Sequence, residues 1–276
     1  MKRACVIGWP IEHSRSPLIH GYWLERYGIA GSYEKIAVTP DAAPDFIRRL
    51  EANGLVGCNV TVPLKEIAFA AVVERDASAR AVGAVNTIWL ENGRTLGANT
   101  DTYGFMTHLE QSAPKWRDAD RPVVLIGAGG AARAVAFGFL EAGVGEVRVV
   151  NRTRARADEL ARQFGPRVKV FDWSRFDAAT RGAGVIVNTT TIGMKGEGVL
   201  PVDWCTPAAG CIVADIVYVP LLTPLLVGAR AAGFGTVDGL GMLLHQAVPG
   251  FEKWFGIRPE VTGELRARLV ADIEGT

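Results

Sequence analysis

The sequence predicts an α/β fold made of two α/β domains that flank a cleft, the second of them Rossmann-type. Short β-rich runs alternate with helical patterns: "ACVIGW", a helix over 17–27, "SYEKIAV", a helix over 42–53, then "GCNVTVP". From residue 123 an apolar strand leads into a glycine turn and a helix, "VVLIGAGGAARAVAFGFLEAG". This order is typical of parallel sheets.

Length and charge limit the functions that the chain can have. Its 276 residues suffice for two domains, and an apolar content of 49% fills two cores. The chain has 30 Lys and Arg against 29 Asp and Glu, so no net field attracts nucleic acid or an anionic membrane. We therefore expect a small-molecule partner, with no nucleic acid and no membrane.

The cysteines and the N-terminus indicate a cytoplasmic protein. Cys5, Cys58, Cys205 and Cys211 lack the spacing of metal ligands, so we expect no metal site and four buried free thiols. The four histidines also lack such spacing and are assigned no chemistry. The first apolar stretch breaks at Pro10, and no run approaches the roughly 18 apolar residues of a membrane span.

The glycine turn "GAGGAA" suits a nucleotide pyrophosphate. Gly127, Ala128, Gly129, Gly130 and Ala131 lie between strand and helix, where small residues let a phosphate approach unpaired N–H groups at the helix N-terminus. Alanine in place of the third glycine is a permitted variant. The alternative is a glycine-rich turn that binds no ligand.

The residues that follow the next strand indicate which dinucleotide cofactor binds. "EVRVVNRT" ends about 22 residues after the first motif glycine, where an acidic residue would bind a ribose 2′-hydroxyl. Asn151, Arg152 and Thr153 stand there instead, with Arg154 and Arg156 following. Guanidinium groups match phosphate oxygens, so Arg152 and Arg156 predict a 2′-phosphate clamp and NADP. The alternative to a phosphate clamp is that these arginines form the solvated first turn of the following helix. We accept this alternative for Arg154.

Polar residues gather in the first half of the chain. In "EHSRSP", Ser14 and Ser16 precede a helix that we expect at Pro17, and one of them is a natural N-cap. In "GCNVTVPLK", strand alternation places Asn59 and Thr61 on one face, with Val60 and Val62 on the other. That polar face predicts the lining of a cleft.

Lys65 and two later motifs complete this group. Pro63 suits the first turn of a helix, which places Lys65 near a helix end whose dipole disfavours its charged form. "GAVNT" and "GANTD" place Asn86 and Asp101 at strand ends, where α/β clefts usually lie. A plain N-cap of the helix "TYGFMTHLE" is an alternative role for Asp101, and the two roles are compatible.

The chain resembles the shikimate dehydrogenases along nearly its full length. The motifs "HSRSP", "NVTVPLK", "GAVNT", "GANTD", "GAGGAA", "NRTRAR", "NTTTIGM", "DIVYVPLLTPLL" and "GLGMLLHQA" occur in the order of that family. The resemblance implies a substrate and catalytic domain at 1–102 plus 239–276 and an NADP-binding domain at 103–238. From the residues themselves, we expect the boundary near the polar, proline-bounded segment at 112–122, which precedes the nucleotide-binding strand.

The same resemblance implies residue roles. Ser14, Ser16 and Tyr218 would bind the substrate carboxylate, and Thr61, Asn86 and Gln246 the ring hydroxyls. Lys65 and Asp101 would be the catalytic pair, with Lys65 either the general base or a group that positions the oxygen. Thr189, flanked by Asn188 and Thr190, would lie near the nucleotide, and Gly239 and Met242 would border the nicotinamide. Met194 is expected in the core.

The implied activity is the reversible NADPH-dependent reduction of 3-dehydroshikimate to shikimate, a step towards aromatic amino acids. A dual quinate and shikimate dehydrogenase is the nearest alternative; the serine motif and the arginines oppose it. A catalytically silent NADP-binding regulatory protein is another, and it is disfavoured because Lys65 and Asp101 are both present. Monomer and homodimer both remain open.

Overall fold

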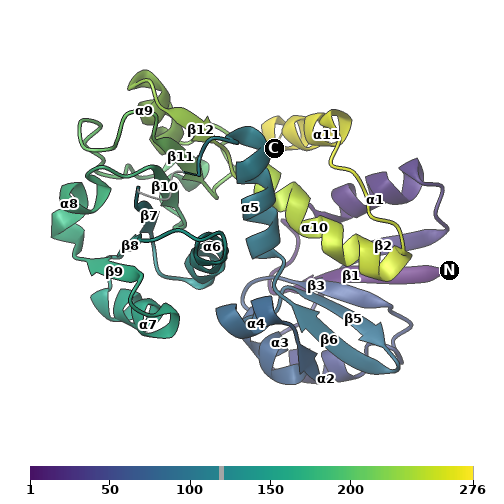
Figure 1. Cartoon of the computed structure of the whole chain (residues 1–276). Helices are drawn as coiled ribbons and strands as arrows, with labels where there is room; N and C mark the ends of the chain where they lie inside the picture. Colours follow the sequence, from purple (N-terminus) through teal and green to yellow (C-terminus); the bar gives the residue numbers. More distant parts are fainter. Residues whose placement is uncertain (118–120, 276) are drawn as a thin grey trace. The chain divides into compact units, whose positions relative to one another are not determined.

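The computed structural model describes residues 1–117 and 121–275, and the chain divides into two compact units (Figure 1). The first unit consists of Met1–Tyr103 and Leu244–Thr276, and the second of Gly104–Leu243. Both divisions fall inside helices rather than in the polar segment 112–122, of which residues 118–120 lie outside the described residues.

The first unit is built on a six-stranded sheet of order β2-β1-β3-β5-β6-β4. The β1–β2, β1–β3 and β4–β6 pairs are parallel, but β5 is antiparallel to both β3 and β6. The sheet is therefore mixed rather than uniformly parallel. Its strands are β1 (Lys2–Gly8), β2 (Gly31–Ala37), β3 (Gly57–Val60), β4 (Glu74–Arg75), β5 (Thr87–Glu91) and β6 (Arg94–Ala98).

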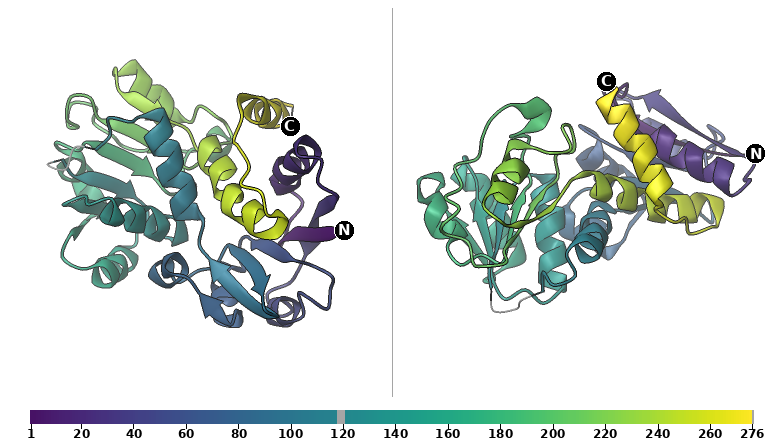
Figure 2. Two further views of the ribbon diagram at one scale, coloured as in Figure 1. Left: turned by 45° about the vertical axis from the view of Figure 1, so that its right-hand side comes forward. Right: turned by 90° about the horizontal axis from the view of Figure 1, so that it is seen from above.

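Helices cover both faces of this sheet. Figures 1 and 2 show α1, α10 and α11 on one side and α2, α3 and α4 on the other. On the α10 side, the indole of Trp254 donates to the Ile88 carbonyl. The helices are α1 (Ser16–Arg26), α2 (Ala43–Arg48), α3 (Lys65–Ala71), α4 (Ala77–Val82), α10 (Leu240–Phe255) and α11 (Gly263–Glu274).

The helix expected over 42–53 is shorter in the structure. α2 ends at Arg48, and the chain continues in turns as far as Gly54, whose φ of +71° is a left-handed conformation that glycine adopts freely. Other expected elements are confirmed: α1 begins one residue before Pro17, and the tail pattern forms α10.

The second unit has a six-stranded sheet of order β12-β11-β10-β7-β8-β9, and every strand pair in it is parallel. The order reverses between β7 and β10, and such switch points are where open α/β sheets bind ligands. The strands are β7 (Val123–Ile126), β8 (Val147–Val150), β9 (Val168–Phe171), β10 (Val185–Asn188), β11 (Ile212–Asp215) and β12 (Gly235–Val237).

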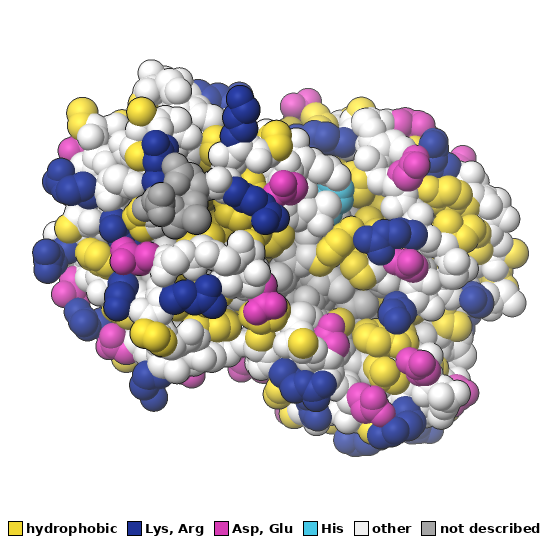
Figure 3. Space-filling view, in the orientation of Figure 1, with side chains coloured by type: hydrophobic (Ala, Val, Ile, Leu, Met, Phe, Trp, Pro, Cys, Tyr) yellow, Lys and Arg dark blue, Asp and Glu magenta, His cyan; other side chains and the backbone are white. Residues whose placement is uncertain are grey.

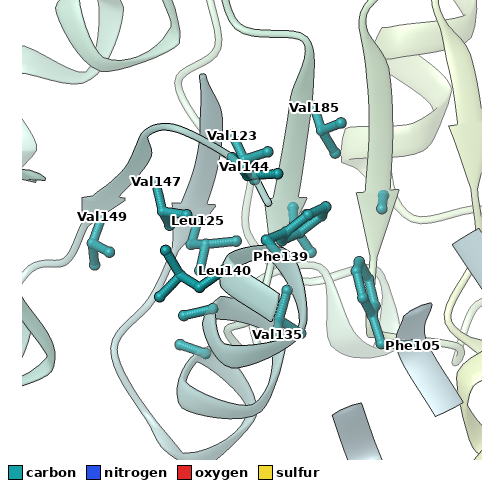
Figure 4. Packing of buried hydrophobic residues seen from close by; sticks show 14 of the residues in the cluster. Phe105, Val123, Leu125, Val135, Phe139, Leu140, Val144, Val147, Val149 and Val185 are labelled. Carbon is teal, nitrogen blue, oxygen red and sulfur yellow. The ribbon is translucent and has the colours of Figure 1, made fainter. Parts of the chain in front are cut away.

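Alternation along β7 creates two apolar layers around this sheet. Val123 and Leu125 pack in one layer with Phe139 of α6 (Figure 4), whereas Val124 and Ile126 pack in the opposite layer. This burial on both faces explains the fully apolar run before the glycine turn. The helices are α5 (Asp101–Ser112), α6 (Gly130–Glu141), α7 (Arg154–Phe164), α8 (Phe176–Thr180) and α9 (Pro224–Ala231), with 3-10 turns η1 (Trp173–Arg175) and η2 (Met194–Gly196).

Two burial predictions are wrong in part. Cys5, Cys58 and Cys211 are buried free thiols, but Cys205 is exposed. It lies in a turn, where its own backbone N–H donates to the Asp203 carboxylate. Met194, expected in the core, is 42% exposed because it begins the surface turn η2.

Candidate functional site

An ion pair joins the starts of two helices in the first unit. Lys65 is the first residue of α3, and Asp101 is the first residue of α5 in the stretch that follows β6. The Lys65 Nζ atom lies 2.6 Å from Asp101 Oδ2. The Asp101 side chain is 12% exposed and that of Lys65 is 29% exposed, so solvent still reaches the amine.

Neighbouring amides fix the Asp101 carboxylate. Asn86 Nδ2 donates to Asp101 Oδ1 at 2.8 Å, so both carboxylate oxygens have a partner. Asn99 Oδ1 accepts the Asp101 N–H at 3.1 Å, while its own amide donates to the Ala84 carbonyl. The acceptor for the first N–H of α5 is therefore Asn99, and the Asp101 carboxylate serves the ion pair.

A second layer of hydroxyl groups holds Asn86, which is 3% exposed. Its Oδ1 accepts the Thr100 N–H at 2.8 Å and the hydroxyls of Thr87 and Thr100 at 3.1 Å. The sequence interpretation did not include Thr87, Asn99 and Thr100. They lie inside "GAVNT" and "GANTD". The feature that could have identified them is that these polar residues cluster at the ends of two strands, where the structure buries them.

The serine motif differs from the expectation, because neither serine caps the helix. Among the described residues no side chain caps α1, which begins at Ser16 with Arg15 at the N-cap. Ser14 Oγ instead accepts the Ser16 N–H at 3.3 Å. Ser16 is buried and hydrogen-bonds Tyr33, whose hydroxyl donates to Asn59 Oδ1 at 2.6 Å. Burial holds the pKa of Tyr33 well above its usual value, so it stays neutral.

The argument from strand alternation at Asn59 is wrong. The Asn59 amide donates to the Asn86 carbonyl at 3.2 Å and to Thr87 Oγ1 at 3.1 Å, so this buried group needs no cleft. β3 ends at Val60 and Val62 is 69% exposed, so the two valines do not share a buried face. Pro63 likewise precedes α3 instead of forming its first turn.

Thr61 and Gln246 are both half-buried in the first unit. Thr61 follows β3, and its hydroxyl has no hydrogen-bond partner in the part of the chain that the structure describes. Gln246 lies on α10. Thr61 therefore offers a hydroxyl that no described side chain uses.

His20 lies in an aromatic cage behind the serine motif. It is fully buried, stacks on Tyr33 with ring centroids 4.0 Å apart, and contacts Trp23, Phe251 and Trp254. Neither ring nitrogen has a hydrogen-bond partner among the described residues. Burial lowers the pKa of His20 to about 3, a shift that the neighbouring Asn59 amide opposes. The imidazole is therefore neutral at physiological pH.

The glycine turn in the second unit leaves room for a phosphate. Gly127 has φ +113°, and a Cβ there would approach Thr189 Oγ1 to 2.6 Å. At Gly129 and Gly130, by contrast, a Cβ would meet no described atom within 4 Å. Gly129 is the N-cap of α6, and no described side chain caps that end. The unpaired N–H groups and open space fit a pyrophosphate. Ala128 is buried and Ala131 half-buried beside them.

The arginines after β8 divide into paired and unpaired groups. Arg154 is bound by Asp172, with Nη1 and Oδ1 2.6 Å apart, and lies 3.6 Å from Asp158. Arg152 and Arg156 are exposed, and neither guanidinium forms a hydrogen bond or ion pair with the described residues. Asn151 donates to the Thr153 carbonyl at 2.7 Å. The two unpaired arginines fit a ribose 2′-phosphate, whereas Arg154 does not.

Thr189 and its neighbours form the end of β10 and the loop after it. Thr189 is buried and donates to the Ile126 carbonyl at 2.8 Å, beneath the glycine turn. Asn188 donates to Asp215 Oδ1 at 2.9 Å and accepts from Thr190. Burial raises the pKa of Asp215 to about 6, against three hydrogen bonds that favour the carboxylate. This network is structural and shapes the floor below Gly127.

The remaining predicted residues also lie in the second unit. Gly239 has no room for a side chain, because a Cβ would clash with the backbone of Ile216 and Val217. Met242 is half-buried on α10 and packs on the apolar core. Tyr218 is half-buried in the loop after β11.

Other classes of site find no support in the described residues. They contain no group of three or more His, Cys, Asp or Glu side chains that could hold a metal ion. None of the helices described is both long and apolar enough to cross a bilayer. Figure 3 shows cationic and anionic side chains interspersed on the visible face.

Three family models match the sequence. They are described as the shikimate dehydrogenase substrate binding domain (residues 6–88), shikimate / quinate 5-dehydrogenase (residues 110–194) and the shikimate 5′-dehydrogenase C-terminal domain (residues 239–263). Together they cover more than half of the chain. The first spans Lys65 and Asn86, and the second spans the glycine turn and the arginines.

Individual relatives match over almost the whole length. The shikimate dehydrogenase (NADP(+)) of Brucella abortus strain S19 is 55% identical over 275 residues, which is 99% of this chain and 95% of the relative. The structure is similar to shikimate 5-dehydrogenase from Thermus thermophilus in complex with NADP(H) and shikimate, with TM-score 0.87, 36% identity, and coverage of 98% and 100%. It is also similar to quinate dehydrogenase from Corynebacterium glutamicum in complex with NAD, with TM-score 0.89, 30% identity, and coverage of 98% and 99%. The chain belongs to the shikimate dehydrogenase family.

Proposed function

We propose that the chain is an NADP-dependent shikimate dehydrogenase that reversibly reduces 3-dehydroshikimate to shikimate, a step towards aromatic amino acids. The observation that carries the proposal is the Lys65–Asp101 ion pair, held by Asn86, in a chain whose second unit has a phosphate-sized glycine turn. The names of the relatives, which include NADP(+) and shikimate, support the same activity.

On the substrate side, Ser14, Ser16 and Tyr218 would donate hydroxyl hydrogens to the carboxylate, since neutral hydroxyls hold an anion by charge-assisted hydrogen bonds. Thr61, Asn86 and Gln246 would bind the ring hydroxyls, which both donate and accept. The unengaged hydroxyl of Thr61 supports this assignment. Asn86 has a further role, because one of its amide hydrogens already holds Asp101.

Lys65 and Asp101 would perform the proton chemistry. The Lys65 ammonium would donate a hydrogen bond to the substrate oxygen and supply its proton during reduction, and Asp101 would hold the amine at 2.6 Å in the required orientation. In the oxidative direction Lys65 would take the proton back. Bound NADPH supplies the hydride.

The cofactor would be held by the residues around the glycine turn. Gly129 and Gly130 would admit the pyrophosphate to the N-terminus of α6, with Gly127, Ala128 and Ala131 shaping the turn. Arg152 and Arg156 would bind the 2′-phosphate, and Asn151 and Thr153 would border the adenosine ribose. Thr189, Gly239 and Met242 would complete the cofactor site.

The proposal is tested by steady-state assays at about 340 nm, where reduced nicotinamides absorb. Purified protein is given shikimate or quinate, each with NADP⁺ or NAD⁺. We expect turnover only with shikimate and NADP⁺. Comparable rates with NAD⁺ would refute the arginine clamp, and absence of turnover in all four combinations would favour an NADP-binding protein without catalysis.

A dual quinate and shikimate dehydrogenase is the second candidate, because a structural neighbour at 30% identity is a quinate dehydrogenase with bound NAD. Ser14 and Ser16 and the unpaired Arg152 favour shikimate and NADP. The quinate arm of the same assay decides between the two.

We further propose a cytoplasmic monomer or homodimer that binds no nucleic acid, and light scattering of the purified protein measures its mass.

A further inference from the structure

The first unit contains a cavity of about 470 Å³ that lies outside the proposed site. It is bordered by Thr87 and Trp89 of β5, by Tyr103, and by the C-terminal half of α10 at Pro249 and Lys253. Lys65, Asn86 and Asp101 do not line it. All of its lining residues belong to the first unit, so the cavity is complete within that unit.

One wall of the cavity is the rear of the catalytic network. Thr87, Asn99 and Thr100 line it. The hydroxyls of Thr87 and Thr100 hydrogen-bond Asn86 Oδ1, and Asn99 accepts the N–H of Asp101. The cavity is therefore linked to Asp101 directly through Asn99, and through a threonine hydroxyl followed by Asn86.

Two cations and two anions border the cavity, and among them Arg258 and Glu252 form an ion pair. Arg258 is bound by Glu252 at 2.6 Å and by the Tyr103 hydroxyl at 2.7 Å. Asp76 accepts the Ala79 N–H and the Ser78 hydroxyl at 2.7 Å as the cap of α4. Lys253 has no ion pair or hydrogen bond to the described residues, and its ammonium lies 4.9 Å from the centroid of the Trp89 ring. Lys253 is therefore the cation with which an anionic ligand could pair, and Asp76 is a carboxylate that likewise has no ion pair with the described residues.

Trp89 supplies an apolar surface and an unused donor. Its indole Nε1 is buried and has no hydrogen-bond acceptor among the described residues. A buried donor without an acceptor destabilises the folded state, and a ligand acceptor would relieve this cost. Since the Lys253 side chain lies over the indole, its movement onto an anion would uncover the ring for a ligand.

We propose that this cavity is a regulatory site for a small aromatic carboxylate. The carboxylate pairs with Lys253, the ring packs on Trp89, and a polar edge of the ligand competes for the Thr100 hydroxyl. When the Thr100 hydroxyl bonds the ligand, its hydrogen bond to Asn86 Oδ1 is lost. Asn86 then holds the Asp101 carboxylate less firmly. Occupation of the cavity therefore lowers kcat, a loss that saturating shikimate does not reverse, and raises the KM for shikimate to a lesser degree because Asn86 also binds a ring hydroxyl. The kinetic part rests on the proposed dehydrogenase function, whereas the binding part does not.

The test uses phenylacetate as the probe, with neutral phenylacetamide as the matched control compound. Isothermal titration calorimetry of the full chain up to about 10 mM probe measures binding without turnover. We expect phenylacetate to bind at least about 10-fold more weakly to Lys253→Gln, because the charged contact is lost. Lys169→Gln removes an exposed lysine from the other unit and should bind like the wild type.

Kinetic assays with saturating NADP⁺ then locate the bound probe. A decrease in kcat that saturating shikimate does not reverse, abolished in Lys253→Gln and retained in Lys169→Gln, supports the regulatory site. Competition with shikimate that is equal in both variants overturns it, because the probe would then occupy the serine-lined pocket. Absence of calorimetric binding, or equal binding of phenylacetamide, also overturns it, and neither result affects the dehydrogenase assignment.

Discussion

The Lys65 ammonium lies 2.6 Å from Oδ2 of Asp101, and Asn86 donates to the other carboxylate oxygen at 2.8 Å. The pair joins the first residues of α3 and α5, which lie 36 positions apart in the sequence. Charge and orientation are thus set by side chains from three separate segments. A lysine held in this orientation can exchange a proton with a bound hydroxyl group.

The first prediction concerns this pair. Lys65→Ala and Asp101→Asn should each lower kcat by about 10²- to 10⁴-fold, the usual contribution of proton transfer. NADP⁺ binding should persist, because neither residue lies in the unit with the glycine turn. Steady-state assays and fluorescence titration with NADPH measure the two effects. Wild-type turnover in Lys65→Ala would contradict the catalytic assignment.

A second prediction concerns Thr100 as a positioning residue for Asn86. Thr100→Val removes a hydroxyl 3.1 Å from Asn86 Oδ1 and should reduce kcat about 3- to 10-fold, with a smaller rise in the KM for shikimate, because one hydrogen bond contributes about 1 kcal/mol. Thr100→Ser keeps the hydroxyl and should retain most activity. Equal losses in the two variants would indicate a packing role instead.

The arginines after β8 provide a third prediction with an internal control. Arg152→Ala should raise the KM for NADP⁺ about 10- to 100-fold and leave that for NAD⁺ unchanged, because a charge-assisted bond to the 2′-phosphate is lost. Arg154→Ala should change neither value, since Asp172 and Asp158 already bind that guanidinium. A larger effect at Arg154 than at Arg152 would reverse the assignment.

A fourth prediction separates two glycines of one turn. Gly127→Ala should destabilise the protein, because φ is +113° and the new Cβ would lie 2.6 Å from Thr189 Oγ1. Gly129→Ala, at φ −90° with open space around it, should leave thermal stability nearly unchanged but raise the KM for NADP⁺. Thermal melts and kinetics of both variants make the comparison.

The fifth prediction is that two buried groups give opposing pH dependences of stability. His20 has a folded pKa of about 3 against 6.5 unfolded, so the unfolded state binds more protons between these values. Its contribution is complete above pH 6.5 and is lost as pH falls towards 3. Asp215 has a folded pKa of about 6 against 3.8 unfolded, so its contribution is complete below pH 3.8 and is lost as pH rises through 6.

The two effects should largely cancel in the wild type between about pH 4 and 6, where each amounts to roughly 2–3 kcal/mol. His20→Phe should leave a free energy of unfolding that falls with rising pH over this interval. Asp215→Asn should leave one that rises. Urea unfolding at several pH values measures both slopes, and identical slopes in the two variants would rule out this account.

Much of the fold followed from local sequence patterns. The fully apolar run 123–126 and the small residues after it predicted a buried parallel strand and a nucleotide turn, because both depend on short-range periodicity and glycine chemistry. The antiparallel β5 was not predicted, since strand direction within a sheet depends on distant pairing partners. The early end of α2 was missed for a related reason, because propensity is weak at helix boundaries.

Burial was harder to predict than element type. Asn59 seemed to need a cleft, yet Tyr33, Thr87 and the Asn86 carbonyl satisfy its amide inside the unit. Met194 and Cys205 were expected inside because of their chemistry, and lie in surface turns. Buried positions are mostly apolar, but an apolar residue is often exposed, so residue type alone does not predict burial. The position of the residue in the fold decides whether it is buried.

The sequence alone determined the α/β class, the glycine turn, the absence of an acidic residue after β8 and the family motifs in their order. Each of these is a property of neighbouring residues, which short stretches of chain carry by themselves. Only the tertiary structure decided that Lys65 meets Asp101, that Asp172 binds Arg154 while Arg152 has no partner among the described residues, and that Thr100 supports Asn86. These contacts depend on the order of strands in each sheet, which brings together side chains that no local pattern relates.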